Sequence, residues 1–574
     1  MKRKWFLTSA VTLSLSVSTL FPMVSFAAQK GDLNNDNNVD SLDFGYYRKY
    51  LLGSQQLNDE SVADLNGDGE ANSLDFGILR RYILGFDTEI GNGNSNNNGN
   101  SGSNSENKLE YAEKIFGQEI ISVEILANEA DWQYMLDNAT KEEYIKVDVV
   151  VNGTKFTDVG IRPKGNSSLT QVANSNSDRY SFRLKFDKFV ENQTCFGLES
   201  FVLNNMLGDY TYMKEYVTFD MMKLVGVKAP LFGYSNISVN GKPWGTYFAV
   251  ELYNKNYKQR VFGDKKGELY NVKMSSVDNG QNQQGGFGGF GGFGGFGGGG
   301  GSLQYKDDNS SSYPDIFTNG VGTTKEDDYQ RVIAALKALS NGTDLETYFD
   351  VDAILRYLAA HTFVVNLDSY SSFMAQNYYI YERNGQITIL PWDYNFAWGG
   401  FMTGDVKTAI NFPIDTPVSG VEMSTRPLIE KLLANSSYRD KYHQYLRLLV
   451  DEYFANGKFE AKIQQLNSLI SQHVQNDKSA FCTYDQYQKA ITAFIKLGNL
   501  RAQSVDGQLK GTVPSTTSAQ NANSGSLIDS NGLNLNDLGN GFGGGFGGGF
   551  GGGGGFDGGG FDGGGWGQWG QWGQ

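Results

Sequence analysis

A 12-residue loop that occurs twice constrains the fold of this chain more than any other sequence feature. Residues 32–43 recur in register as residues 64–75, and side chains carrying oxygen stand at loop positions 1, 3, 5, 9 and 12 of both copies. This spacing lets a loop wrap a hard cation such as calcium, with position 7 offering its backbone carbonyl. A solvated acidic turn is the alternative, but ligand and apolar positions are duplicated together, which argues against it. The predicted calcium ligands are Asp32, Asn34, Asp36, Asn38, Asp40 and Asp43, and in the second loop Asp64, Asn66, Asp68, Glu70, Asn72 and Asp75.

Each loop leads into a short amphipathic stretch, which predicts helices over residues 44–52 and 76–84 that stop at Gly53 and Gly85. No helix precedes either loop, position 12 is Asp rather than the usual Glu, and position 6 of the first loop is Asn37 rather than Gly. The pattern resembles a type I dockerin, the all-α loop-helix module that attaches secreted proteins to cohesins on a cellulosomal scaffoldin. The resemblance implies two calcium ions, a cohesin partner, and cohesin contacts from Ser41, Leu42, Arg48, Lys49, Ser73, Leu74, Arg80 and Arg81.

Residues 1–28 have the form of a secretory signal peptide, with a cationic start, an apolar run and small residues at the end. An uncleaved membrane anchor is the alternative, and no later segment is apolar enough to span a bilayer. We therefore expect a secreted, extracellular protein of the cellulosome or cell surface. The net charge of −15 argues against nucleic acid and anionic membranes as partners. Only Cys195 and Cys482 occur, so disulfides do not hold the fold together, and the spacing leaves open whether the two pair.

Composition divides the rest of the chain. A dockerin at 29–86 is followed by a Gly/Asn/Ser linker at 87–107 and a globular domain at 108–510. A Gly-Gly-Phe tract at 285–301 interrupts that domain, and a low-complexity Gly/Phe/Trp tail follows at 511–574. Glycine at this density predicts disorder in the insert and in residues 539–574. The aromatic side chains of these tracts either contact polysaccharide or other copies, or belong to an inert loop and tail.

The first half of the globular domain reads mainly as strand, at residues 120–126, 144–151, 159–162 and 180–186. A basic turn at 162–168 offers cations, hydroxyls and backbone amides to phosphate oxygens, with Arg162, Lys164 and Ser167 as candidates, although a basic turn is usually just solvated. In the strict alternation of residues 179–186, Arg183 and Lys185 share one strand face while apolar side chains pack on the other.

A helix predicted over residues 209–226, with Asp209 as its N-cap, carries Glu215, which could pair with Lys185 or Arg183. A hairpin at 234–251 follows, turning at residues 240–241. The order of strand, phosphate-type turn, basic strand, helix and hairpin resembles the small lobe of a protein kinase.

The second half is predicted to be helical at 325–340 and 351–365. The candidate catalytic and metal-binding residues are concentrated directly after these helices. Asp368 follows the second helix, and a hairpin turning at residues 384–385 places Asn377 and Asp393 at the same rim. Phosphoryl transfer needs one carboxylate near the acceptor hydroxyl, and a second carboxylate with an amide to hold magnesium. The alternative is that Asp368 caps a loop and Asp393 belongs to a structural network.

Five separated motifs resemble the spore coat protein H (CotH) kinase family: Arg-Pro-Lys-Gly-Asn-Ser-Ser at 162–168, the alternating strand at 180–188, Asn-Gly-Lys-Pro-Trp-Gly-Thr-Tyr at 240–247, Asn-Tyr-Tyr-Ile-Tyr at 377–381 and Pro-Trp-Asp at 391–393. The resemblance implies an α+β fold with a two-lobed atypical-kinase domain, and transfer of phosphate from ATP to serine on secreted proteins with Mg²⁺ or Mn²⁺. It assigns Asp368 as the catalytic carboxylate, Asp393 and Asn377 as metal ligands, and Arg183 or Lys185, backed by Glu215, to the phosphates. The family's Trp-Asp-x-Asp pattern ends here in Asn395, which removes one charge.

Two further functions stay open at this point. A catalytically inactive structural or adhesive subunit would keep the fold without turnover. A glycoside hydrolase would fit a cellulosomal context, but it needs a pair of acidic residues at a sugar cleft, and no pattern singles out such a pair. Neither the phosphate acceptor nor the cohesin type follows from the sequence.

Overall fold

The computed structural model describes residues 29–36, 38–51, 53–57, 59–67, 69–83, 109–273 and 300–539, which fall into two compact units. The predicted signal peptide, the linker, most of the Gly-Gly-Phe insert and residues 540–574 lie outside the described residues. So do Asn37, Leu52, Asp68, Leu84 and Gly85, and the side chains of Ser41, Ser73, Leu74, Arg80 and Arg81.

The first unit contains the duplicated loops and the two helices that follow them, α1 (Ser41–Leu51) and α2 (Ser73–Ile83), with a 3-10 turn at Glu60–Val62 between them. Gly53 ends the first helix with a positive φ of 70°, as predicted. The equivalent rings Phe44 and Phe76 stack with centroids 4.2 Å apart, so the internal repeat packs against its own copy. The core of this unit comprises Leu33, Tyr47, Val62, Ala63, Leu65 and Leu79.

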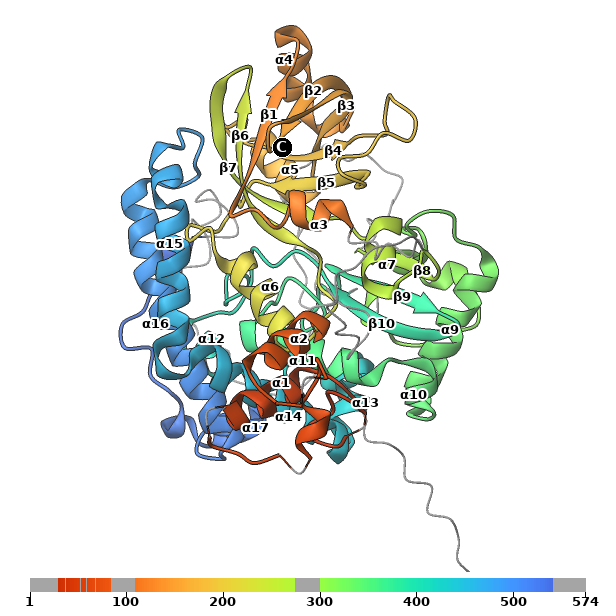
Figure 1. The fold of residues 1–574 in the computed structure, drawn as a ribbon, viewed down its shortest axis with the longest axis vertical. Coiled ribbons are helices and arrows are strands. Elements are labelled where there is room, and N and C mark those ends of the chain that lie inside the picture. The colour runs from red at the N-terminus through yellow and green to blue at the C-terminus, as the bar shows by residue number, and fades with distance from the viewer. Residues whose placement is uncertain are drawn as a thin grey trace, which may run out of the picture. The chain divides into compact units, whose positions relative to one another are not determined.

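In the second unit, seven strands close into a barrel in the order β1-β2-β3-β4-β5-β7-β6 (Figure 1). All neighbouring strands are antiparallel except β1 and β6, which pair in parallel and complete the closure. The strands are β1 (Ile120–Leu126), β2 (Ile145–Val151), β3 (Thr154–Lys164), β4 (Ser181–Lys185), β5 (Ser200–Asn204), β6 (Phe232–Val239) and β7 (Lys242–Glu251).

The barrel follows from the alternation of apolar and polar residues along its strands. Phe182 and Leu184 of β4 are fully buried, whereas Arg183 and Lys185 lie on the other face, as the pattern predicts. The turn between β6 and β7 places Asn240 and Gly241 at positive φ, which allows a tight hairpin.

The rest of this unit contains a three-stranded sheet, ordered β10-β9-β8, and most of the helices. The sheet comprises β8 (Glu268–Val272), β9 (Tyr378–Arg383) and β10 (Gln386–Pro391). The helices are α3 (Glu110–Lys114), α4 (Glu129–Asp137), α5 (Ser167–Ala173), α6 (Lys214–Leu224), α7 (Lys255–Phe262), α8 (Pro314–Phe317), α9 (Glu326–Asn341), α10 (Leu345–Tyr348), α11 (Val351–Val364), α12 (Val406–Asn411), α13 (Pro427–Ala434), α14 (Ser436–Leu449), α15 (Lys458–Asn476), α16 (Tyr484–Leu509) and α17 (Thr517–Ala522). Figure 1 shows the barrel at one end of this unit and α11, α14 and α16 toward the other.

A buried ion pair ties the barrel to the α15–α16 connection. The Arg179 guanidinium bonds the Asp477 carboxylate at 2.7 Å, and both side chains are almost wholly removed from solvent. Arg179 also donates to the Ser479 hydroxyl at 2.6 Å and to the backbone carbonyls of Asn205 and Thr246. Its donors are therefore satisfied inside the protein, which is the condition under which a buried cation is stable.

The structure corrects three details of the sequence predictions. Helix α6 begins at Lys214 and its N-cap is Met213, because Asp209 instead closes a preceding turn by accepting from the backbone N–H groups of Thr211 and Lys214. Ordered structure continues past residue 510 to residue 539, where Leu538 is buried and its carbonyl accepts from the N–H of Tyr210. Gly301, placed in the predicted disordered insert, accepts the Tyr378 hydroxyl at 2.6 Å.

The mixed helix-and-strand class that the sequence predicted is confirmed, whereas the closed barrel was not predicted. A two-lobed kinase-like arrangement stays a prediction. Cys195 and Cys482 are free thiols rather than a disulfide. No helix among the described residues is long and apolar enough to cross a bilayer.

Candidate functional site

The two duplicated loops close around their last acidic residue. The Asp43 carboxylate accepts the backbone N–H groups of Leu33 and Asn34 at 2.7 and 3.1 Å, and that of Asp40 at 2.8 Å. Asp75 repeats the pattern in the second loop with Leu65, Asn66 and Asn72 at 2.9, 2.9 and 3.0 Å. Position 12 therefore fixes the shape of each loop.

The donor chemistry of these loops fits a calcium ion. Asp32, Asp40 and Asp43 are all buried in the first loop, and burying several carboxylates together is costly unless a cation lies among them. Among the described residues, which leave out Asp68, no group of three or more His, Cys, Asp or Glu side chains is arranged to hold a metal. The loops mix carboxylate with Asn oxygens, and Asn34 and Asn38 lie beside Asp36 through hydrogen bonds of 3.1 and 2.9 Å.

A second candidate site forms where α11 ends, β9 begins and β10 ends. The Asn377 side-chain amide donates to the backbone carbonyl of Asp368 at 2.8 Å and to its carboxylate at 3.0 Å. Gln376 donates to the other carboxylate oxygen at 3.0 Å. The predicted catalytic Asp368 and the predicted metal ligand Asn377 are thus in direct contact.

Asp393 completes this cluster from the end of β10. Its negative charge and burial together raise the pKa of Asp368 to about 7, with burial as the larger cause. Burial also raises the pKa of Asp393 itself, against the opposing charge of Lys164. The hairpin therefore places Asp393 near Asn377, as predicted, and Asn377 in turn holds Asp368.

Strained backbone marks the same place. Val365, Asn377 and Asp393 all have φ between 50° and 64°, in the left-handed region that side chains disfavour, β-branched Val most of all. Such conformations persist only where the surrounding fold enforces them, and they concentrate at functional sites.

The lysine that faces these carboxylates is Lys164, at the end of β3. Its ammonium donates to the Asn204 side chain at 3.2 Å, and its charge acts on both Asp393 and Glu215. It forms no direct ion pair with either in the described part of the chain, and burial lowers its pKa. Glu215 of α6 is buried and accepts the backbone N–H of Tyr394 at 3.4 Å. Burial, followed by the charge of Asp393, raises the pKa of Glu215 to about 8.

The predicted pairing of Glu215 with Arg183 or Lys185 is wrong. Lys185 pairs with Asp187 at 3.4 Å, and Arg183 makes only a 3.5 Å contact with the Ser200 hydroxyl. The charge of Arg183 does reach Tyr379 of β9, so it lies toward the site, while its Nε is buried without a hydrogen bond.

Of the phosphate-type turn, only Lys164 faces the carboxylates. Arg162 pairs with Glu142 at 2.8 Å and stacks over Tyr144. Ser167 is exposed at the start of α5, a helix too short to form an anion site at its N-terminus. The reason is local geometry, because the strand continues through Lys164 and the turn begins only at Gly165.

Asn204 and Gln376 hold the site together and were not among the predicted residues. Gln376 precedes Asn377 and could have been noticed as its neighbour. Asn204 ends β5, and no sequence signal connects that position to Lys164 before the barrel register is known.

The oxygen atoms at this site fit a divalent cation. The Asp393 carboxylate accepts no hydrogen bond from the residues that the structure describes, and Asn395 Oδ1 is buried without a partner while its Nδ2 donates to Leu207 at 3.1 Å. Asn377 directs its amide nitrogen to Asp368, so its oxygen is the atom left for a ligand.

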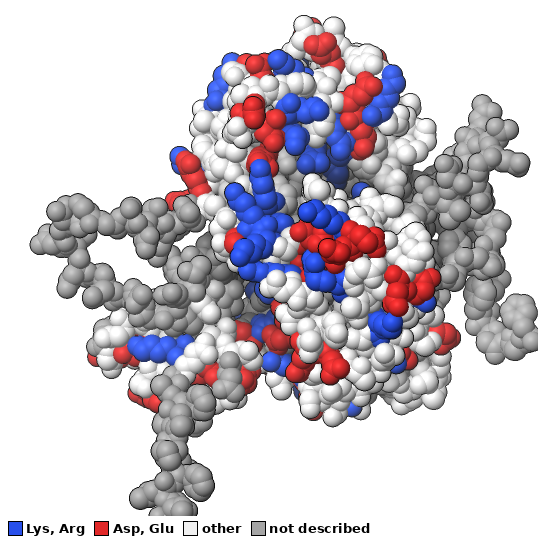
Figure 2. Space-filling view, turned by 90° about the vertical axis from the view of Figure 1, so that its right-hand side faces the viewer, with Lys and Arg blue, Asp and Glu red and all other residues white. Residues whose placement is uncertain are grey.

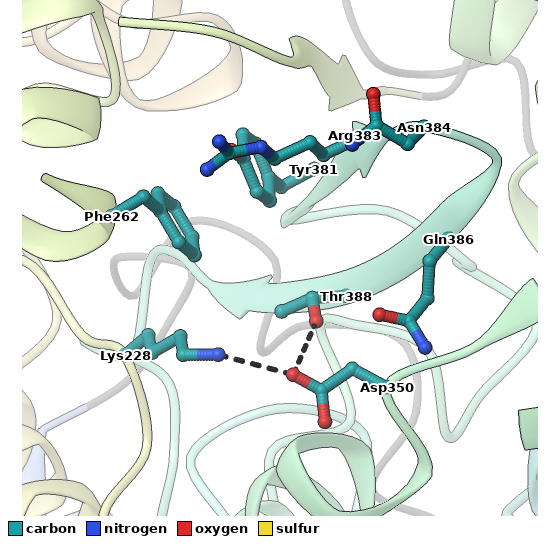
Figure 3. A pocket seen from close by; sticks show the side chains of 8 residues that line it. All are labelled: Lys228, Phe262, Asp350, Tyr381, Arg383, Asn384, Gln386 and Thr388. Atoms are coloured by element: carbon teal, nitrogen blue, oxygen red, sulfur yellow. Dashed lines mark hydrogen bonds and ion pairs between the residues drawn. The ribbon is translucent and has the colours of Figure 1, made fainter. Parts of the chain in front are cut away.

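A separate cavity of about 360 Å³ opens at the other end of the β9–β10 hairpin (Figure 3). Its lining includes Lys228, Asp350 and Arg383, but neither Asp368 nor Asp393. The cavity is therefore not the carboxylate site.

Comparison with known proteins assigns both units. Residues 161–505, more than half of the chain, match the family described as CotH kinase protein. The chain belongs to the CotH family. Residues 30–84 match the dockerin type I domain, so the predicted module is confirmed. The CotH domain is also similar to the inner spore coat protein H of Bacillus subtilis (strain 168), with 23% identity over 318 residues that cover 54% of this chain and 78% of that protein.

The two assignments carry general consequences. Type I dockerins typically bind Ca²⁺ and are typically extracellular, and a dockerin implies a cohesin partner, which supports docking to a cellulosome. The CotH match supports a function of that family for the second unit.

Proposed function

We propose that this chain is a secreted cellulosomal subunit whose CotH domain is an atypical kinase, transferring phosphate from ATP to serine on neighbouring secreted or surface proteins. The observation that carries the proposal is the convergence of Asp368, Asn377, Asp393, Lys164 and Glu215 from four separate segments. Phosphoryl transfer is catalysed mainly by positioning and charge, and this set supplies both.

In this proposal the residues of the site divide the tasks of phosphoryl transfer among them. Asp368, held by Gln376 and Asn377, accepts the proton of the acceptor hydroxyl, for which a pKa raised to about 7 suits a group working near neutral pH. Lys164 places positive charge beside the phosphates and is oriented by Asn204. Glu215 accepts the Tyr394 N–H at the β10 exit and lies close enough to Lys164 for the charge of the lysine to act on it.

Asp393, Asn377 and Asn395 would hold Mg²⁺ or Mn²⁺, which neutralises phosphate charge when bound. Asn395 offers a neutral oxygen where the family commonly has a second Asp. Arg183 is a secondary candidate for phosphate contact, because its charge reaches Tyr379 and its Nε has no hydrogen-bond partner. The barrel and the helical part would form the two lobes.

Labelling with γ-phosphate-labelled ATP and Mn²⁺ tests the proposal on the full chain mixed with cellulosomal proteins. Label transfer should be lost in Asp393→Ala and kept in Asp485→Ala, a matched change of an exposed aspartate on α16. Transfer that survives Asp393→Ala removes this residue from the mechanism.

A structural or adhesive subunit without turnover is the second candidate, and the replacement of an acid by Asn395 favours it. That candidate predicts no label transfer by the unaltered chain and no affinity for Mn²⁺–ATP.

A further inference from the structure

The cavity at the turn end of the β9–β10 hairpin has a floor made by one face of that hairpin. Tyr381 pairs across the strands with Thr388, and Arg383 pairs with Gln386, so these four side chains share a face. Phe262 of α7, and Lys228 with Asp350, form the walls (Figure 3). This cavity is called the bay below. The strand β10 runs roughly 17 Å from Gln386 to Pro391 and so separates the bay from the carboxylate site around Asp368 and Asp393.

The bay carries charges that are already balanced. Lys228 pairs with Asp350 at 3.0 Å and Arg383 pairs with Asp264 at 2.7 Å, and each of the four side chains is about one third exposed. On the face that includes α7 and α9, a group of basic side chains lies directly beside a group of acidic ones (Figure 2). An anionic ligand would therefore find no surplus of positive charge here.

The polar groups of the bay alternate between donors and acceptors. Lys228 and Arg383 donate, Asp350 accepts and Asn384 does both. Gln386 and Thr388 offer acceptor oxygens, because their own donors already bond to the backbone carbonyls of Glu346 and Phe349 and to Asp350. Thr388 already lies 3.3 Å from Asp350, so the hydroxyl and carboxylate face the same space. A ligand with many hydroxyl groups, each donating and accepting, matches this mixture.

An aromatic wall adds an apolar contact. Phe262 and Tyr381 stack with centroids 4.0 Å apart and an interplanar angle of 11°, and the Lys228 ammonium lies 5.4 Å from the Phe262 centroid. Rigid aromatic side chains beside a few polar groups are the usual composition of a small-molecule site, and a volume of about 360 Å³ falls in the usual range.

We propose that this bay binds a short, neutral saccharide through hydroxyl contacts with Lys228, Asp350, Arg383 and Gln386 against the Phe262–Tyr381 wall. The proposal does not depend on kinase activity, because the bay and the carboxylate site share no lining residue.

Ligand-observed NMR with cellotetraose and the full chain tests the proposal. Binding should be insensitive to salt, because neither partner brings a net charge to the bay. Lys228→Met and Gln386→Ala should each weaken binding about fivefold, the effect of one lost hydrogen bond. Gln133→Ala, a matched change of an exposed glutamine on α4, should leave it unchanged.

Gln386 also donates to the Glu346 backbone at 3.0 Å, so thermal melting of both variants checks that the fold is intact, and Lys228→Met gives an independent result. Absence of cellotetraose binding, or binding that survives both bay substitutions, overturns the proposal. Salt-sensitive capture of an aspartate-rich peptide that both substitutions weaken, in place of cellotetraose, would show that the ligand class is wrong.

Discussion

In the dockerin, twelve consecutive residues supply all the candidate ligands of one calcium site, whereas in the CotH domain the candidate site draws on Lys164, Glu215, Asp368 and Asp393. The contacts within the loop are local, since Asp43 accepts three backbone N–H groups of the same twelve residues. The carboxylate site exists only when β3, α6, α11 and the β9–β10 hairpin have packed. We therefore expect the structure of the local site, in the dockerin, to depend on bound calcium. The dispersed site, in the CotH domain, should depend on the stability of that domain's fold.

Calcium removal should have the largest effect and should separate the two regions. With EGTA, the dockerin should lose helical circular dichroism and cohesin binding completely, because its buried carboxylates lose their cation. The melting of the CotH domain should not change. A shift in the melting of the CotH domain on chelation would show that the two regions are coupled. It would contradict the contrast between a local and a dispersed site.

Loss of the buried Arg179–Asp477 pair should destabilise the fold of the CotH domain, on which its dispersed site depends. Arg179→Met leaves Asp477 buried with its charge uncompensated, which should lower the unfolding free energy by about 3–5 kcal/mol. Lys462→Met, which removes a partly exposed pair with Asp220, should cost no more than about 1 kcal/mol. Denaturant titration measures both, and equal costs would contradict the anchoring role of Arg179.

Two lysines of the barrel strands, Lys164 and Lys185, sharpen the comparison within the site. Lys164→Met should lower kcat/KM for label transfer about 100-fold, since it removes the charge facing Asp393. Lys185→Met should leave kcat/KM within about twofold, because Lys185 pairs with Asp187 away from the carboxylates. A larger loss in Lys185→Met than in Lys164→Met would favour the sequence prediction that Lys185 contacts the phosphates.

The protonation of His361 should have the smallest effect near pH 7, and it appears as a pH dependence of stability at lower pH. His361 is buried between the hydroxyls of Tyr394 and Ser371 at 2.9 and 3.0 Å, and burial lowers its pKa to about 3. Below about pH 6.5 the His361 imidazole is therefore protonated in the unfolded state but still neutral in the folded state. Stability from this residue is present above that pH and falls by about 1.4 kcal/mol for each unit toward pH 3.

Denaturant titrations at several pH values should show a shallower slope in His361→Gln and an unchanged slope in His473→Gln. His473 lies at the surface beside Asn236, so its environment changes less on unfolding. Equal slopes in all three proteins would contradict the assignment to His361.

Local signals made the dockerin predictable. Repeated ligand spacing placed both loops, and the helices differ from the prediction mainly at their first turns, where Asp40 accepts the Leu42 N–H and starts the helix early. The hairpins were predictable for the same reason, because Asn-Gly pairs at 240–241 and 384–385 specify tight turns.

Long-range packing decided what the sequence could not supply. Asp368, Asn377 and Asp393 were correctly brought together, because a hairpin joins the last two. The surroundings of Glu215 were not predictable, since Arg183, Lys185 and Lys164 are all basic and only the folded barrel decides that the charge of Lys164 acts on Glu215. The closure of the barrel depends on the parallel pairing of β1 with β6, which no local sequence pattern predicts.

Calorimetric titration of Mn²⁺–ATP into the unaltered chain and into Asp393→Asn tests the central claim most directly. The convergence of Asp368, Asn377, Asp393 and Lys164 predicts one nucleotide site in the CotH domain, weakened at least about tenfold by the substitution, with the melting of the domain preserved. Absence of binding, or equal affinity in both proteins, would contradict the claim and leave the dockerin as the one functional assignment of the two.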